Sequence, residues 1–338
     1  MKRKMEERMV IGCFVLLVVL VFSLCGMDRA ESKDPDYPTK SITLNLPFAA
    51  GGTTGAVVRP LTEAAGKSLG QQFVIVHKPG GGGILCAVTV MNSAPDGYTL
   101  GTVGAGMVFV APFSEECPYK DLSGLSMIMN FGGYNYPVMV RGDSPWKTWK
   151  DFVDWARQNP KAAKVGITGG KMVTSQGLIF GQIEMREQVE FTYIPLKGSA
   201  ETLSSILGGH TNLFGSSVDP GTMQYVKEGK LRILTYLAKE KIPGYENIPS
   251  TQDLYGFSLP NILGVVGPKG LPPSIQKKLE DAFTKAIKDP DFVNIMERMY
   301  MPIVYMDGAQ MKKYTDETLA KVGGIMKVLK AEEMKKKQ

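Results

Sequence analysis

From residue 37 onward, the chain alternates between short apolar segments typical of strands and longer segments typical of helices. Ile42, Leu44 and Leu46 alternate with polar residues, which is the period-two pattern of a strand. Apolar residues then recur at helical spacing until Gly70, a residue type that commonly follows the end of a helix. Strands that alternate with helices predict mainly parallel sheets with helices on both faces, so this order predicts an α/β fold.

The same patterns predict the other elements along the chain. Further strands are expected at 73–76, 98–103, 165–168, 191–194, 211–214, 231–237 and 263–267. Thr148 with Asp151 resembles a capping box, which predicts a helix whose buried face carries aromatic residues. Ser274 is expected to cap a helix that reaches about residue 288, and a last helix is expected at 309–329. Pro60 lacks an N–H group, so we expect it to delay or kink the helix that ends at Gly70.

Length and composition predict a folded protein of more than one domain. The chain has 338 residues, more than one compact core usually serves. Hydrophobic residues make up 43% and charged residues 21%, as in folded globular proteins. The formal charge is +6, and the first 30 residues supply +2 of it because they hold five basic and three acidic residues. The remaining charge is small and scattered, which does not fit a nucleic-acid-binding surface.

A basic segment followed by a short apolar run marks the N-terminus. The apolar run extends from Val10 to Leu24 and would span roughly 22 Å as a helix, less than a hydrocarbon core of about 30 Å. With the polar residues that follow, it predicts that residues 1–30 are an export signal and that the mature protein is periplasmic or otherwise extracytoplasmic. An uncleaved membrane anchor is one alternative. Lipid attachment at Cys25 is another, disfavoured by the large Leu24 before it.

Beyond the first 30 residues the chain has two cysteines, Cys86 and Cys117. Export makes a disulfide between them chemically possible, but the pairing cannot be deduced from sequence. Two separate buried thiols are the alternative.

The common catalytic templates do not fit this sequence. The two histidines, His77 and His210, and the two distant thiols make no metal-ligand spacing. Neither histidine lies in a motif that supplies the base for a serine nucleophile. The segment ending at Met172 lacks the first glycine and the Ser or Thr of a phosphate loop, and the glycines at 80–83 lack the spacing of a dinucleotide fingerprint. We therefore expect no enzymatic activity, no cofactor and no bound metal.

Several glycine- or hydroxyl-rich loops lie where a predicted strand leads into a helix. Parallel sheets bind ligands at this edge, and the N–H groups at a helix start attract anions. For any single loop, an ordinary tight connection is the alternative. The residues expected to bind a ligand are Phe48, Ala50, Gly51, Gly52, Thr53, Thr54, Gly104, Ala105, Thr168, Gly169, Gly170, Lys171, Lys197, Gly198, Ser199 and Asp219.

A series of short segments occurs in a fixed order between residues 37 and 324. They are Tyr-Pro-Thr-Lys-Ser-Ile at 37–42, Pro-Phe-Ala-Ala-Gly-Gly at 47–52, Ala-Pro-Asp-Gly-Tyr-Thr-Leu at 94–100, Lys-Gly-Ser at 197–199, Gly-Lys-Leu-Arg at 229–232, Gly-Pro at 267–268 and Leu-Pro-Pro at 271–273. In this order and spacing the chain resembles the extracytoplasmic binding proteins of tripartite tricarboxylate transporters, also called the Bug family. Each piece alone is only moderately specific, so the resemblance depends on the whole series.

The resemblance implies a type II periplasmic-binding-protein fold, in which two doubly wound α/β lobes flank a ligand cleft. Lobe 1 would comprise 37–139 and 262–335, and lobe 2 would comprise 140–261, with the chain crossing near 138–141 and 259–263. The loop after the first strand and the loop containing Lys171 would face each other across the cleft. The resemblance further implies a small carboxylate ligand and integral membrane transporter subunits as partners. We expect a monomer that binds no nucleic acid.

Departures from the family pattern concern the ligand. Gly55 stands where the family usually has an aspartate, and Leu196 stands where a tyrosine usually precedes Lys197. The loop at 166–172 is altered, and a histidine that follows it in the family is missing. Lys171 either adds positive charge toward an anionic ligand or is a solvated surface lysine. We expect these departures to change the usual ligand and to leave the fold intact.

The sequence thus predicts an extracytoplasmic solute-binding protein that captures a small carboxylate for a tripartite tricarboxylate-type membrane transporter. A ligand-sensing module for a membrane receptor is one alternative, and it needs the same closing cleft. An α/β enzyme is the other, and the poor supply of catalytic groups opposes it.

Overall fold

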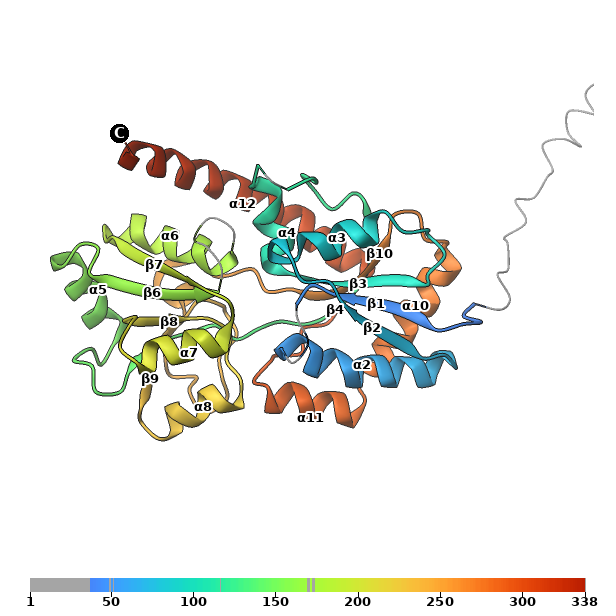
Figure 1. Ribbon diagram of the computed structural model, residues 1–338, viewed down its shortest axis with the longest axis horizontal. Coiled ribbons are helices and arrows are strands. Elements are labelled where there is room, and N and C mark those ends of the chain that lie inside the picture. The colour runs from blue at the N-terminus through green and yellow to red at the C-terminus, as the bar shows by residue number, and fades with distance from the viewer. Residues whose placement is uncertain are drawn as a thin grey trace, which may run out of the picture. The chain divides into compact units, whose positions relative to one another are not determined.

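Two β-sheets, each with its own helices, organise the chain (Figure 1). The computed structural model describes residues 37–337 apart from 49, 51, 116, 169, 170, 172 and 173, so the predicted export signal at 1–30 lies outside the described residues. Both sheets belong to one contiguous unit that begins at Pro38. No helix in the described part of the chain is long and apolar enough to cross a membrane.

The first sheet has six strands among the described residues, in the order β11-β4-β10-β3-β1-β2. The strands are β1 (Ile42–Leu46), β2 (Phe73–His77), β3 (Thr99–Gly104), β4 (Leu125–Gly132), β10 (Leu263–Pro268) and β11 (Met306–Asp307). Its helices are α2 (Thr53–Leu69), α3 (Ile84–Met91), α4 (Ala105–Phe109), α10 (Pro273–Ala286), α11 (Pro290–Arg298) and α12 (Gly308–Lys337), with short 3-10 turns at Gly81–Gly83 and Ala111–Phe113. Helix α2 packs against α10 and α11, which come from the far end of the sequence.

The second sheet has five strands in the described chain, in the order β7-β6-β8-β5-β9. The strands are β5 (Pro137–Arg141), β6 (Ala163–Thr168), β7 (Phe191–Leu196), β8 (Leu213–Gly215) and β9 (Leu231–Tyr236). The helices are α5 (Trp149–Gln158), α6 (Ser175–Glu187), α7 (Ser199–Leu207), α8 (Pro220–Lys227) and α9 (Thr251–Tyr255). Each predicted strand of this half is present, with bounds that differ by a few residues.

The expectation of mainly parallel sheets is wrong. Among the described strands, β1 pairs in parallel with β2 and β3, and β6 pairs in parallel with β7 and β8. The other five pairings are antiparallel. Each of them involves β5, which is the first strand after the chain enters the second sheet, or β10 or β11, which come after the chain has returned to the first sheet. Such strands enter from the opposite side, so they run against their neighbours.

The chain passes between the sheets twice. The first passage, 133–136, joins β4 to β5, so residues 138–141, where we expected this crossing, are instead a strand of the second sheet. The second passage, 237–262, joins β9 to β10, and the expected crossing at 259–263 lies at its end. The N–H of Leu237 donates to the carbonyl of Tyr136 at 2.9 Å, which joins the two crossings. The lobe limits given above remain a proposal, and the sheet memberships favour moving the first limit to before Pro137.

Helix α12 is longer than the helix expected at 309–329, and it reaches the second sheet's helices. It contacts β4 and α4 of the first half and α6 of the second (Figure 1). Leu329 on this helix is 3% exposed, and a Cβ atom added to Gly181 of α6 would lie 2.9 Å from its Cδ2 atom. A glycine at this position of α6 therefore lets the two helices approach closely.

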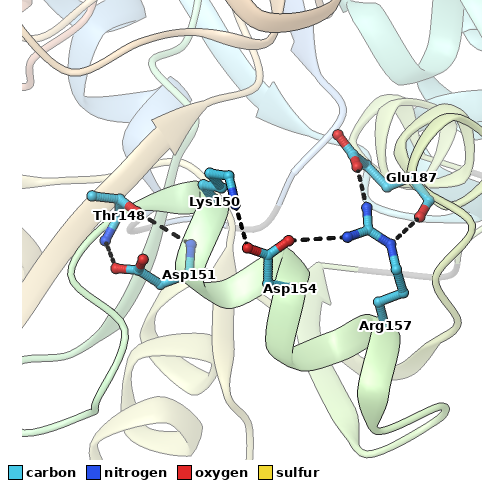
Figure 2. Close-up of polar contacts among 6 residues, drawn as sticks. All are labelled: Thr148, Lys150, Asp151, Asp154, Arg157 and Glu187. Atoms are coloured by element: carbon cyan, nitrogen blue, oxygen red, sulfur yellow. Dashed lines mark hydrogen bonds and ion pairs between the residues drawn. The ribbon is translucent and has the colours of Figure 1, made fainter.

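The capping expectations have different outcomes. Thr148 and Asp151 form the predicted capping box at the start of α5 (Figure 2). Ser274 does not cap α10, because the helix begins at Pro273, whose missing N–H group needs no partner there. Helix α2 starts at Thr53 and includes Pro60, so the late start is wrong, and the other alternative, a kink at Pro60, stays a prediction. Its buried side chains, among them Val57, fix this helix through packing despite the lost hydrogen bond.

Helix α5 carries both a buried aromatic face and a surface ion-pair series. Figure 2 shows Arg157 between Asp154 of its own helix, at 3.0 Å, and Glu187 of α6, at 2.7 Å. Because Asp154 and Arg157 are exposed and Glu187 is partly exposed, these ion pairs add little to stability. On the other face, Phe152 is fully buried and its ring stacks on that of Trp149, with 5.7 Å between the ring centroids. The aromatic stripe is therefore core packing, as expected.

Candidate functional site

The predicted loops of the first sheet lie at one edge of it. Strands β1 and β3 are adjacent and parallel, so the loop after β1 and the loop after β3 leave the sheet on the same side. The described residues of this group are Phe48, Ala50, Gly52, Thr53, Thr54, Gly104 and Ala105, while Gly51 lies outside the described residues. The parallel pairing thus brings together two segments that are about fifty residues apart in sequence.

The start of α2 has backbone N–H groups that receive no cap from a side chain of the same turn. Gly52, the N-cap residue, has extended backbone angles (φ −80°, ψ 165°) and forms no side-chain cap hydrogen bond. The first turn contains no acidic residue. The first N–H groups of a helix have no partner within the helix, and the helix dipole adds positive potential there. An anion can therefore bind at this helix start through backbone N–H groups.

A cavity of about 230 Å³ lies beside this helix start, between α2 and β2. Its walls include Gly52, Gly55, Arg59 and His77. The ring nitrogen Nδ1 of His77 lies 2.8 Å from the carbonyl oxygen of Phe48, so the imidazole contacts the loop directly. A Cβ atom at Gly55 would lie 3.7 Å from His77 Cε1, so a side chain at this position would extend into the cavity. Sequence reasoning missed Arg59 and His77 because their proximity depends on the pairing of β1 with β2.

The predicted loops of the second sheet also share one edge. Thr168 at the end of β6 pairs with Leu196 at the end of β7, and β8 runs parallel beside them. The hydroxyl groups of Thr168 and Ser216 lie 3.0 Å apart. The described members of this group are Thr168, Lys171, Lys197, Gly198, Ser199 and Asp219, while Gly169 and Gly170 lie outside the described residues.

Carboxylates of the protein itself serve two helix starts in the second group. Asp219 caps α8, because its Oδ1 atom accepts hydrogen bonds from the N–H of Thr222 at 2.8 Å and from its hydroxyl at 2.9 Å. Glu201 in the first turn of α7 accepts a hydrogen bond from the N–H of Lys197 at 2.7 Å. These carboxylates place negative charge at the starts of α7 and α8, which makes both helix starts less favourable for a ligand carboxylate. The start of α2 has no such competitor.

Lys171 is neither solvated nor unpaired. Its Nζ atom lies 2.6 Å from Glu184 Oε2, and the side chains of Lys171 and Glu184 are 19% and 7% exposed. The same ammonium group lies 5.1 Å from the centre of the Tyr193 ring. Glu184 also accepts a hydrogen bond from the N–H of Phe191 at 2.8 Å. The alternative of a solvated surface lysine is therefore wrong, and the role of Lys171 toward a ligand stays a prediction.

A second cavity, of about 480 Å³, lies against the second crossing. Its walls come from α6, α12 and the crossing itself, and include Glu240, Asn261 and Tyr314. None of the described residues that we predicted to bind a ligand lines it. Sequence analysis did not identify this cavity because its walls come from segments distant in sequence.

The two described thiols do not supply reactive groups. Cys86 and Cys117 are both buried and unpaired. Burial raises the pKa of Cys86 to about 12, so its thiol stays protonated at neutral pH. No cluster of potential metal ligands occurs among the residues that the structure describes.

Residues 57–330 match the family described as the tripartite tricarboxylate transporter family receptor. The chain belongs to this receptor family. The Cupriavidus necator "UPF0065 protein in gbd 5'region" is 33% identical to this receptor over 301 residues, which are 89% of this chain and 90% of that protein. Protein BugT of Bordetella pertussis is 23% identical over 93% of this chain and 96% of its own length.

Solved structures of binding proteins have the same fold as this receptor. A TctC solute-binding protein from Polaromonas, without ligand, has a TM-score of 0.70 and 26% identity, and the match covers 86% of this chain and 99% of that one. MatC of Rhodopseudomonas palustris with bound malate has a TM-score of 0.73 at 22% identity, covering 86% and 100% of the two chains. An R. palustris protein with adipate has a TM-score of 0.76 at 21% identity, covering 87% and 98%. The fold of this receptor is the two-lobed α/β fold of periplasmic binding proteins.

The Lys171–Glu184 pair yields a stability prediction. Lys171→Met should lower the free energy of unfolding by about 2 kcal/mol, because it leaves a buried carboxylate without its cation. Denaturant unfolding followed by tryptophan fluorescence measures this change, since Trp146, Trp149 and Trp155 are the three tryptophans of the chain. Lys227→Met, at an exposed lysine of the same half, is the matched control, and we expect it to stay within about 0.5 kcal/mol of the wild type. Equal stabilities of the two variants would contradict the structural pairing.

Proposed function

We propose that this receptor captures a small carboxylate outside the cytoplasmic membrane and delivers it to the membrane subunits of a tripartite tricarboxylate-type transporter. The observation that carries the proposal is the start of α2, where extended Gly52 leaves the first N–H groups without a side-chain cap or an acidic neighbour. Membership of the transporter receptor family supports the transport role. Two proteins of the same fold hold malate and adipate, which supports a carboxylate as the ligand class.

The ligand carboxylate binds mainly through backbone N–H groups and hydroxyls in this proposal. Glycine at the N-cap lets an anion approach the backbone, and Thr53 supplies a hydroxyl beside it. Thr168 and its neighbours, at the edge of the second sheet, contact the other end of the ligand. Arg59 adds positive charge beside the first loop, and His77 lies next to it in the cavity that Gly55 leaves open. The ligand is thus held between the strand ends of the two sheets.

Binding without turnover is part of the proposal. The described thiols are buried, and the pKa of the Cys86 thiol is raised by burial, so neither is placed to attack a bound ligand. We further propose that the protein acts as a monomer that closes on its ligand and then meets the transporter. A sensing role would use the same closure, and transport is preferred because the family is that of a transporter receptor.

Export through the N-terminal segment places the receptor on the outer side of the membrane. Residues 1–30 supply the basic start and short apolar run of such a signal. The mature chain from the native host should therefore lack the segment from Met1 to Leu24. Intact-mass analysis measures this, and a chain that retains the segment would contradict the assignment of an export signal.

A thermal-shift screen against mono-, di- and tricarboxylates tests the ligand class. A carboxylate at 100 times its dissociation constant should stabilise the folded protein by about 2.7 kcal/mol. Gly52→Val should abolish most of this stabilisation, because the branched side chain blocks the approach of an anion to the helix start. The backbone angles of Gly52 suit any residue, so the variant should fold.

Gly324→Val in α12 is the control for the glycine replacement, because a Cβ atom there meets no other atom within 4 Å. The control should bind the best carboxylate as the wild type does. Circular dichroism checks that both variants are folded. Wild-type affinity in a folded Gly52→Val protein would exclude this loop as the anchor, and failure of every carboxylate to stabilise the wild type would exclude the ligand class.

A further inference from the structure

A buried hydrogen bond joins the start of α2 to the first crossing. The Oγ1 atom of Thr54 lies 2.5 Å from the phenol oxygen of Tyr134. Both residues are buried, at 4% and 8% exposure. Thr54 is the second residue of α2, inside the turn whose N–H groups we assign to the ligand, and Tyr134 lies between β4 and β5. One contact therefore links the helix start to the segment that joins the two sheets.

Tyr134 is bound in turn to the second crossing. Its N–H donates to Asn261 Oδ1 at 2.8 Å, and Asn261 Nδ2 donates back to the Tyr134 carbonyl at 3.1 Å. The same amide nitrogen donates to Glu240 Oε2 at 3.0 Å. A Cβ atom at Gly133 would lie 2.3 Å from the side chain of Asn261, so a larger residue would push this amide away. The contacts thus run without a break from α2 through both crossings.

The phenol of Tyr134 takes part in this hydrogen bond in its protonated form. Burial raises the pKa of Tyr134 to about 12, so its hydroxyl keeps its proton at neutral pH. Each of the two hydroxyl groups can therefore act as the donor or the acceptor. Replacing either hydroxyl by a group of similar shape without oxygen removes the bond and leaves one buried polar group unsatisfied.

We propose that Tyr134 is a positioning residue for ligand binding, which holds the first turn of α2 through Thr54 and ties it to Asn261 in the second crossing. The inference rests on the proposed function of the α2 start, which it extends to Tyr134 and Asn261, two residues outside the predicted ligand-binding set. A ligand shifts the arrangement of the lobes only if it interacts differently with the alternatives. The Thr54–Tyr134 hydrogen bond makes the position of the α2 turn depend on the position of the crossings. A ligand bound at that turn therefore interacts differently with different arrangements of the lobes.

The first arm of the experiment needs no ligand. Hydrogen exchange at the Tyr134 N–H reports its bond to Asn261, and Thr54→Val should increase the exchange rate there in the free protein. Thr54→Ser keeps the hydroxyl and should exchange as the wild type does. Tyr119→Phe is the control, because it removes another buried tyrosine hydrogen bond, to the carbonyl of Met107 at 3.0 Å, away from the crossings. It should leave exchange at Tyr134 unchanged.

The second arm measures affinity for malate or adipate, whichever binds the wild type more tightly, by calorimetry. Thr54→Val and Tyr134→Phe should each weaken binding about fivefold. The double variant should bind no more weakly than either single variant, because both changes remove the same interaction. Tyr119→Phe should bind as the wild type does. A merely structural role would lower stability in the Thr54 and Tyr134 variants without this non-additivity in affinity.

The outcomes separate the two proposals. Unchanged exchange at Tyr134 in Thr54→Val overturns the positioning role, whether or not a carboxylate binds. Additive or absent effects on affinity also overturn it while leaving the ligand assignment in place. If the wild type binds neither acid and Thr54→Val shows the predicted exchange change, malate and adipate are excluded as ligands and the link between α2 and the crossings is kept.

Discussion

The parallel pairing of β1 with β3, and of β6 with β7 and β8, is the constraint on which the candidate site depends. Parallel neighbours end at the same edge of a sheet, so their following loops meet there although they are distant in sequence. Each sheet thereby collects its glycine- and hydroxyl-bearing loops at one edge. The antiparallel strands, β5 and β10 among them, bring the chain from one sheet into the other. The crossings thus join two edges that each carry candidate ligand groups.

Electrostatics distinguishes the helix starts at these edges from one another. Glu201 and Asp219 place carboxylates at the starts of α7 and α8, where they accept backbone hydrogen bonds. At the opposite edge of the second sheet, the pKa of Asp151 at the start of α5 is likewise lowered by a hydrogen bond from the backbone N–H of Thr148. Helix α2 has neither a capping side chain nor an acid in its first turn. The start of α4, at the same edge, shares both properties. We therefore propose that a ligand carboxylate binds at this edge of the first sheet, where neither helix start carries a carboxylate of its own.

The sequence was sufficient for the alternating elements and the capping box at Thr148, because these depend on local patterns. It was not sufficient for β4, a buried run that lacks the alternation of a half-exposed strand, or for α11. The pairing of Lys171 with Glu184, and of Thr54 with Tyr134, depends on side-chain positions set by the tertiary fold. The loop residues were predicted from the strand-to-helix junctions, but which helix start lacks its own carboxylate became clear only from the hydrogen bonds.

We propose that a small carboxylate binds between the strand ends of the two sheets and draws the lobes together about the crossings at 133–136 and 237–262. Small-angle X-ray scattering of the exported chain, with and without a saturating carboxylate shown to bind by calorimetry, tests it most directly. Hinge closure predicts a smaller radius of gyration in the bound state, as in other proteins whose domains close around a ligand. Identical scattering curves at saturation would contradict the account and indicate a rigid pocket.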